Sequence, residues 1–251
     1  MPQAEFLRQQ SLHLSLAELK AACANCNLRE ICLPAGLTAL ELDQLDTLVN
    51  IRRKVKRGEA LYRAGEAFDA IFAVRSGFFK LRVSYEDGRD QVTGFFMGGE
   101  ILGMDGIGQG IHHCDAVALE DSVVCSIPYE KLEELSREVT ALQRHFHKMM
   151  SREIVRESGV MMLLGVMRAE ERIAAFLLNL SQRLAVRGYS PLEFNLRMTR
   201  EEIGSYLGLK LETVSRAFSR FHALGLIEVQ QKLVRIIDIE GLKNVYAQHV
   251  R

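Results

Sequence analysis

The sequence lacks an excess of charge of either sign, because 32 Lys and Arg residues balance 32 Asp and Glu residues. A neutral chain is not expected to coat nucleic acid irrespective of sequence, since such binding depends on a strongly basic surface. The balance leaves room for a local basic patch, which is what a sequence-specific DNA-binding protein needs. With 48% hydrophobic and 25% charged residues, the composition is that of a globular protein rather than a disordered one.

Long apolar runs are missing as well. No stretch approaches the roughly 18 to 20 uninterrupted apolar residues that a membrane helix requires, and residues 1–10 lack the apolar core of a signal peptide. We therefore expect a cytoplasmic protein that does not associate with a membrane. Structural disulfides are rare in that compartment, so the spacing of the five cysteines points to metal or redox chemistry instead.

Signatures of catalysis are also absent from the sequence. It contains no phosphate-binding P-loop, no HExxH zinc motif, no nucleophile elbow and no paired carboxylates in a recognisable catalytic setting. The adjacent histidines His112 and His113 are expected in a solvated loop. We therefore expect no catalytic residues, and an enzyme built on a β-barrel is the remote alternative.

Periodicity divides the rest of the chain into elements. Thr38 can cap a short helix that places Leu42, Leu45 and Leu48 on one face. Within residues 51–127, short β-type runs such as 71–77, 78–84 and 91–97 are cut by glycine-containing turns. This pattern is typical of an antiparallel barrel or jelly roll.

Beyond Pro128 the pattern becomes helical, with an amphipathic helix over residues 169–187 and a short strand over 194–198. Together these elements predict an α+β protein, which we divide into four parts. They are a cysteine-containing segment (1–36), an antiparallel β-roll domain (37–136), a dimerisation helix (137–168) and a winged helix-turn-helix domain (169–251).

The predicted helix over residues 139–167 carries a mostly apolar heptad pattern, interrupted by Glu157. One interpretation is a buried intramolecular helix with Glu157 rotated to solvent. We favour a dimer interface, because the barrel alone is too small to cover so long a helix. The residues predicted to form this interface are Met150, Ile154, Glu157, Met161 and Leu164.

Residues 199–224 show the pattern of a helix-turn-helix. Thr199 and Glu202 have the spacing of a capping box at the start of a first helix. Gly204 permits close approach of a second helix, and Gly208 is placed to end the first in a tight turn. The second helix, over 212–224, has an expected buried stripe of Val214, Phe218, Phe221 and Leu224.

The opposite face of the second helix presents Glu212, Ser215 and Arg216, residue types that read base edges in the major groove. The alternative for Glu212 and Arg216 is an ordinary salt bridge between positions i and i+4. Two β-type runs, 226–229 and 234–237, are predicted to form a wing. The candidate DNA-binding residues are Thr199, Arg200, Lys210, Glu212, Thr213, Ser215, Arg216 and Arg220.

Cys23, Cys26 and Cys32 have the spacing C-x2-C-x5-C. Four thiolates are needed to close a tetrahedral zinc site or to hold an iron–sulfur cluster, so a fourth must come from Cys114 or Cys125. The spacing by itself leaves the metal undecided. Each of the two distant cysteines also fits a buried position on a strand face, where cysteine is common.

The cysteine triplet, the glycine-punctuated barrel, the long helix and the winged helix-turn-helix together resemble the CRP/FNR superfamily. The resemblance is closest to the oxygen-sensing fumarate–nitrate reduction regulators, FNR and ANR, and covers roughly residues 20–240. The motifs that carry it include Cys23-x2-Cys26-x5-Cys32-x-Pro34, Ala118-Leu-Glu-Asp-Ser-Val-Val-Cys125-Ser-Ile-Pro128 and Glu212-Thr-Val-Ser-Arg216.

This resemblance implies a 4Fe–4S cluster, with Cys23, Cys26, Cys32 and Cys125 as its ligands. It also implies that the cluster is intact without oxygen and favours a homodimer that binds an inverted repeat in double-stranded DNA. Cys114 has no counterpart in that ligand set and is expected to be a buried thiol. The alternatives are a regulator of the same type with structural zinc, or one that senses through thiol–disulfide chemistry.

The resemblance bears on two further partners. Cyclic-nucleotide-binding relatives hold the phosphate with an arginine in the barrel, whereas this chain has Ile111-His112-His113-Cys114 there. We therefore expect no cyclic nucleotide. RNA polymerase is an expected partner, and the predicted loops over residues 85–90 and 116–121 are candidates for contacting it.

Overall fold

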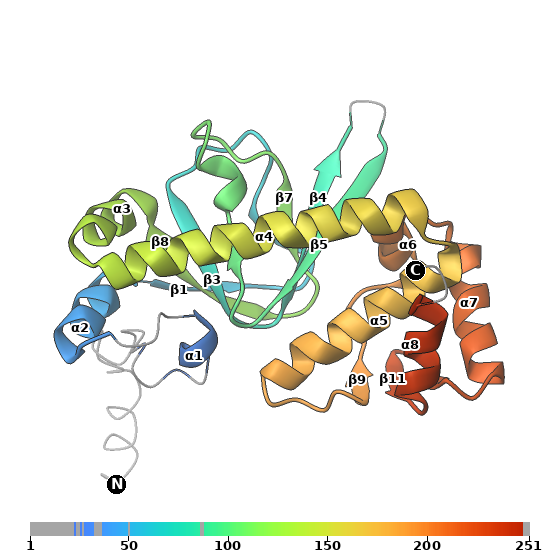
Figure 1. Ribbon diagram of the computed structural model, residues 1–251. Helices are drawn as coiled ribbons and strands as arrows, with labels where there is room; N and C mark the ends of the chain where they lie inside the picture. The colour runs from blue at the N-terminus through green and yellow to red at the C-terminus, as the bar shows by residue number, and fades with distance from the viewer. Residues whose placement is uncertain are drawn as a thin grey trace, which may run out of the picture.

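The computed structural model describes residues 23, 26, 28–32, 37–49, 51–85 and 88–247. In it a β-roll is joined by one long helix to a C-terminal domain of helices and three short strands (Figure 1). The predicted α+β fold class is confirmed. Most of the predicted cysteine-containing segment lies outside the described residues, but its three cysteines are among those described.

The β-roll consists of two antiparallel four-stranded sheets with strand orders β1-β8-β3-β6 and β2-β7-β4-β5. The buried cluster between them takes side chains from both sheets, including Phe72 and Phe79. The roll predicted from the glycine-cut strand pattern is therefore confirmed. The strands are β1 (Ile51–Val55), β2 (Ala60–Tyr62), β3 (Ala70–Ser76), β4 (Phe78–Ser84), β5 (Asp90–Met97), β6 (Ile101–Leu102), β7 (Asp115–Ala118) and β8 (Ser122–Pro128).

The prediction of a surface loop over residues 116–121 was wrong in its first half. Residues 116–118 belong to β7, and both Ala116 and Ala118 are buried. These two small side chains alternate along the strand and fill the interior of the roll.

A second apolar layer covers the outer face of the sheet that contains β3 and β8. It is built by α2 (Ala39–Leu48), α3 (Tyr129–Glu138) and the first turn of the following helix. Thr38 caps α2 as predicted, since its side chain accepts a hydrogen bond from the Glu41 N–H and its own N–H donates to the Glu41 carboxylate. Three of the cysteines pack against the same layer, namely Cys23, Cys32 and Cys125.

The long helix α4 (Thr140–Val166) runs across the front of the β-roll toward the C-terminal domain (Figure 1). Leu142 is its one fully buried residue within the described chain. The interpretation of this segment as a buried intramolecular helix is therefore wrong. A short helical turn, η3 (Met104–Gly106), lies between β6 and β7 in the sequence.

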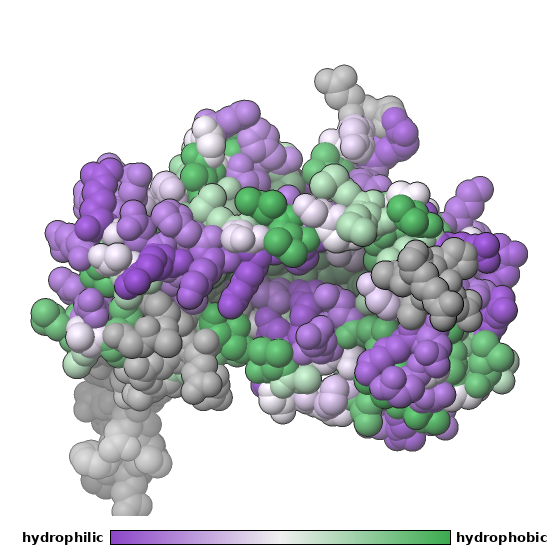
Figure 2. Space-filling model, in the orientation of Figure 1, coloured by the Kyte–Doolittle hydropathy of each residue, from purple (hydrophilic) through white to green (hydrophobic). Residues whose placement is uncertain are grey.

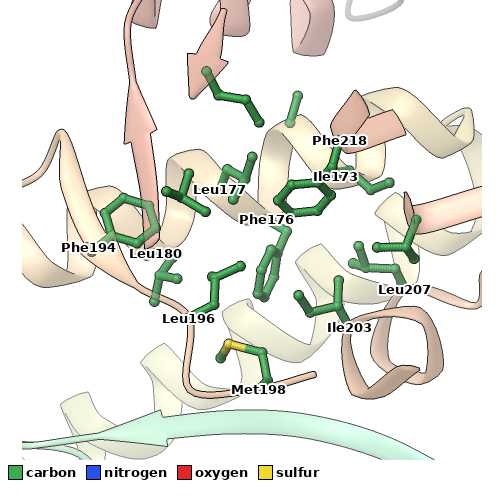
Figure 3. Close-up of a cluster of buried hydrophobic side chains, with 14 of the residues drawn as sticks. Ile173, Phe176, Leu177, Leu180, Phe194, Leu196, Met198, Ile203, Leu207 and Phe218 are labelled. Atoms are coloured by element: carbon green, nitrogen blue, oxygen red, sulfur yellow. The ribbon is translucent and has the colours of Figure 1, made fainter. Parts of the chain in front are cut away.

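The C-terminal domain packs around one apolar core, to which α5, α6 and α7 contribute side chains directed toward one another (Figure 3). Its strands form a sheet of order β10-β11-β9. The elements are α5 (Ala169–Val186), β9 (Glu193–Asn195), α6 (Arg200–Leu207), α7 (Leu211–Ala223), β10 (Ile227–Gln230), β11 (Leu233–Ile236) and α8 (Ile239–Ala247). No helix in the described ranges is long and apolar enough to cross a membrane.

Two local predictions for this domain were wrong. Leu224, expected in the buried stripe of the second helix, is exposed, because α7 ends at Ala223 and the chain then turns away. Ala217 is buried in the stripe instead. The strand expected over 194–198 ends at Asn195, although Leu196 and Met198 are still buried in the core.

Candidate functional site

The helices α6 and α7 form the predicted helix-turn-helix. Thr199 and Glu202 make the capping box, with the Thr199 N–H donating to the Glu202 carboxylate at 2.6 Å and the Glu202 N–H donating to Thr199 Oγ1 at 3.1 Å. Gly208 ends α6 in the left-handed conformation, with φ of 64°. A Cβ on Gly204 would lie 2.5 Å from the carbonyl oxygen of Leu209, so this turn requires glycine in α6.

The helix α7 has a buried face and an exposed face. Val214 and Phe218 are among its buried residues, whereas Glu212, Ser215 and Arg216 are exposed. Among the ion pairs of the described residues there is none between Glu212 and Arg216, so the salt-bridge alternative does not occupy these side chains. Their face is exposed, as insertion of the helix into a DNA groove would require.

The other candidate DNA-binding residues fall into two groups. Lys210 precedes α7 and is exposed, and Thr213 is partly buried beside it. Arg220 pairs with Glu170 at 2.7 Å. The guanidinium of Arg200 lies over the Phe218 ring, 3.2 Å from its centroid, and burial lowers its pKa to about 10. A DNA contact by Arg200 or Arg220 would therefore require release from these partners.

The predicted wing is present as the antiparallel hairpin of β10 and β11, and β9 adds a third strand to it. The turn between the two strands contains Gln231, whose φ of 55° places it in the left-handed region. Arg235 on β11 pairs with Glu193 and Glu228. Arg235 thus links the two strands of the wing to each other and links the wing to β9.

The face of α4 that is turned away from the β-roll is rich in exposed apolar side chains, which follow the middle and the end of the helix in Figure 2. Ile154 is 62% exposed and Met161 is 66% exposed. Glu157 is also exposed, and Leu164 is half-buried. Exposed apolar residues of α4 that the heptad pattern had not singled out are Val155, Met162 and Val166.

Four cysteines line one cavity of about 60 Å³, namely Cys23, Cys26, Cys32 and Cys125. Cys32 is the last residue of α1 (Arg29–Cys32), and Cys125 lies in β8 between its partners Arg52 of β1 and Ala73 of β3. The remaining lining is mostly aliphatic and comes from α2, α3, α4 and the sheet. The fold therefore brings Cys23, Cys26 and Cys32 close to Cys125, although almost the whole β-roll separates them in the sequence.

Burial governs the acidity of these thiols. It raises the pKa of Cys32 to about 12, with the neighbouring Cys125 and Cys26 adding to the rise. Burial and the carboxylate of Asp46 raise the pKa of Cys23, and burial raises the pKa of Cys125. Such thiols stay protonated at neutral pH, and a positively charged centre is needed to stabilise them as thiolates.

Cys114 lies elsewhere, inside the β-roll with Ala116 and Ala118, and its Sγ is 3.4 Å from Asp105. The cysteine spacing had left both Cys114 and Cys125 as candidates for the fourth ligand. In the structure only Cys125 lines the cavity with the triplet. As placed, no group of three or more His, Cys, Asp or Glu side chains in the described part of the chain could hold a single metal ion.

One histidine of the pair was mispredicted. His113 is exposed as expected, but His112 is buried, stacked on Tyr62 at a ring-centroid distance of 3.7 Å. Its Nδ1 lies 3.3 Å from Asp105. His145 on α4 was not singled out from the sequence, yet it lines the cysteine cavity and its Nε2 lies 3.1 Å from the Cys32 carbonyl oxygen.

A β-roll with four thiols around one cavity, joined by a long helix to a winged helix-turn-helix, has the architecture of a DNA-binding transcription regulator. Residues 52–138 match the cyclic nucleotide-binding domain family, and residues 171–245 match the Crp-like helix-turn-helix domain family. The chain belongs to the CRP/FNR superfamily of transcription regulators, in the branch that contains FNR and ANR. Membership of this family makes it a regulator and excludes the enzyme alternative.

Similar proteins span nearly its whole length. The chain is 49% identical to the transcriptional regulatory protein btr of Bordetella pertussis over 91% of this chain and 94% of that protein. It is 42% identical to the fumarate and nitrate reduction regulatory protein of Escherichia coli, over 91% of each chain. Among solved structures, FixK2 from Bradyrhizobium japonicum is 30% identical and superposes with a TM-score of 0.71 over 77% of this chain and 96% of that one.

Proposed function

We propose that this chain is an oxygen-responsive global regulator of anaerobic metabolism. A 4Fe–4S cluster is held by Cys23, Cys26, Cys32 and Cys125, and the loaded homodimer binds an inverted repeat in DNA. The observation that carries the proposal is the convergence of these four thiols on one apolar cavity beside the start of α4. The names of the FNR and ANR relatives support the same assignment.

The residues present fit such a cluster. Thiolates are its usual protein ligands, and the chain supplies four of them, three from a short segment and one from a rigid strand. The rest of the cavity lining is mostly aliphatic, so the thiols lie in weakly polar surroundings. When bound, the cluster would supply an oxygen-labile centre that stabilises the cysteines as thiolates.

One observation weighs on the alternatives. Direct thiol–disulfide sensing requires a readily formed thiolate, whereas the pKa values of Cys23, Cys32 and Cys125 are all raised. A structural zinc ion would use the same thiolate donors as the cluster, and analysis of iron, zinc and acid-labile sulfide distinguishes the two.

The exposed face of α4 is the proposed dimer interface, formed by Met150, Ile154, Glu157, Met161 and Leu164. Pairing with a second copy removes the apolar surface of Ile154 and Met161 from water. Glu157 facing its symmetry mate places two carboxylates together, which opposes association unless the surrounding packing compensates. The hydrogen bond between His145 and the Cys32 carbonyl joins the cysteine segment to this helix.

A two-fold dimer presents two copies of α7, which is why an inverted repeat is the expected target. Glu212, Ser215 and Arg216 are the proposed base-reading residues, because they occupy the exposed face near the start of the helix. We propose that the DNA backbone is contacted by Thr199, Lys210 and Thr213. Arg200 and Arg220 would join them once released from Phe218 and Glu170. RNA polymerase is the proposed protein partner.

A cyclic nucleotide is not part of the proposal. The cavity of about 270 Å³ between the β-roll and α4 is lined by carboxylates of Asp105, Glu153 and Glu157. Its described lining contains no lysine or arginine. A phosphate group placed there would meet like charges rather than a cation.

The ligand assignment is tested by comparing Cys125→Ser with Cys114→Ser, both purified without oxygen. We expect Cys125→Ser to lose most of its bound iron, because one thiolate of four is gone. Cys114→Ser should keep about four irons per chain, because its thiol faces the roll interior. Equal iron in both variants, measured with circular dichroism to confirm folding, would contradict the assignment.

A further inference from the structure

The turn at residues 98–100, between β5 and β6, is clamped to the DNA-binding domain by Glu100. The Glu100 carboxylate accepts hydrogen bonds from Arg183 at 2.6 Å and 3.0 Å and from Arg187 at 2.6 Å. Arg183 also donates to the Phe95 carbonyl at 2.7 Å, and Arg187 donates to the Gly98 carbonyl. Arg183 lies in the last turn of α5 and Arg187 is the C-cap residue that follows it, whereas Glu100 belongs to the β-roll.

This ion-pair cluster is largely removed from solvent, with the side chains of Glu100, Arg183 and Arg187 only 21%, 19% and 5% exposed. Burial alone would raise the pKa of Glu100, but the two guanidiniums bring it below its ordinary value. Charged hydrogen bonds of this geometry are strong, and removal of one partner leaves an uncompensated buried charge. The orientation of α5 relative to the roll is therefore tightly fixed at this point.

The other side of the same turn contacts the cysteine segment. A Cβ on Gly98 would lie 3.1 Å from Leu28 Cδ1, and a Cβ on Gly99 would lie 2.9 Å from Ile31 Cγ2. Leu28 and Ile31 are interleaved with the ligand cysteines Cys26 and Cys32. The turn is thus packed between the segment that holds the thiols and the first helix of the DNA-binding domain.

We propose that Glu100 is a positioning residue that transmits the arrangement of the cysteine segment to the helix-turn-helix through α5. The route lies within one chain, and it operates alongside the dimer interface rather than through it. It rests on the proposed function in one respect, since loss of the cluster is what rearranges the cysteine segment. Contiguous packed side chains with a fixed charged contact are the kind of connection that carries coupling between sites.

A second contact between the same domains provides a matched control. Lys80 of β4 pairs with Glu202 of α6 at 2.7 Å, and β4 belongs to the sheet that does not contain Cys125. If the proposal is right, breaking the two interdomain contacts has different consequences. Loss of the Lys80 contact weakens DNA binding equally with and without the cluster, whereas loss of the Glu100 contact removes the difference between those states.

The experiment compares Glu100→Gln, Glu100→Asp and Lys80→Met with the unaltered chain. Affinity for an inverted-repeat duplex is measured by fluorescence anisotropy before and after exposure to air, and iron content and sedimentation are measured on the same samples. We expect Glu100→Gln to load iron and dimerise normally. The ratio of its DNA affinity before exposure to air to its affinity afterwards should be about tenfold smaller than in the unaltered chain. Glu100→Asp, which keeps the charge, and Lys80→Met should retain most of that ratio. An unchanged ratio in Glu100→Gln would overturn the proposal.

A second measurement does not depend on the cluster. In the metal-free chain, Gly98→Ala places a methyl group against Leu28 without backbone strain, whereas Gly108→Ala points into open space. We expect amide hydrogen exchange of residues 180–187 to become about tenfold faster in Gly98→Ala and to stay unchanged in Gly108→Ala. Equal exchange in both variants contradicts the connection. If the unaltered chain binds no iron, the proposed function fails, and this measurement still decides whether the turn couples the two domains.

Discussion

At the scale of single residues, the electrostatic environment assigns different tasks to chemically equivalent side chains. Glu202 caps α6 and pairs with Lys80, and these contacts bring its pKa below the ordinary value although burial opposes this. Glu157 lies exposed among apolar neighbours with no ion pair in the described chain. Glu202 is therefore held by contacts within the fold, whereas Glu157 is exposed on α4, where we propose that it acts on dimerisation.

The depressed pKa of Glu202 predicts a pH-dependent contribution to stability. A lowered folded-state pKa stabilises the protein above the unfolded value of about 4.5, and this contribution disappears as the pH falls through the folded value. Glu202→Gln should therefore lower the free energy of unfolding by about 1 kcal/mol at pH 7, with a smaller difference at pH 4. Urea denaturation across this range, with the exposed neighbour Glu201→Gln as control, measures it. A difference that is the same at every pH would show that the carboxylate charge is not responsible.

At the scale of elements, α4 has one flank on the β-roll and the other open. Its apolar positions beyond the heptad, Val155, Met162 and Val166, widen the exposed stripe. Exposed apolar side chains gathered along one helix are typical of an interaction face. We propose that the central carboxylate of Glu157 keeps the association weak enough to be regulated.

Replacement of that carboxylate gives the corresponding prediction. Glu157→Ala removes repulsion between symmetry-related charges and adds a small apolar surface, so we expect a tighter dimer in air than that of the unaltered chain. Sedimentation velocity over a concentration series measures the change, with Glu134→Ala on the exposed side of α3 as a control for loss of charge alone. A variant that sediments as an unchanged monomer would remove Glu157 from the dimer mechanism.

Local signals in the sequence were sufficient for most elements. The caps at Thr38 and Thr199, the turn at Gly208 and the alternating strands of the roll all depend on neighbours within a few residues, and the structure has them where they were predicted. Leu224 was misplaced because helical spacing continues in the sequence after α7 has ended. The spacing of apolar residues predicts which face of a helix is buried better than it predicts where the helix ends.

At the scale of the whole molecule, the decisive contacts join residues that local patterns cannot relate. Cys114 and Cys125 both fit a strand face, and only the closed roll shows that Cys125 faces the triplet. Likewise, nothing near Glu100 in the sequence indicates that its partners are Arg183 and Arg187 of another domain. The burial of His112 could not be predicted from its neighbours in the sequence, because its stacking partner, Tyr62, comes from a distant strand.

The central claim is that the four converging thiols hold an oxygen-labile cluster that governs DNA binding. The most direct test is to purify the chain under strict anaerobiosis and assay iron, zinc, acid-labile sulfide and DNA affinity before and after admitting air. We predict about four irons and four sulfides per chain, lost in air together with DNA binding. Zinc or no metal, with DNA binding indifferent to air, would contradict the claim and leave a DNA-binding regulator that does not sense oxygen in this way.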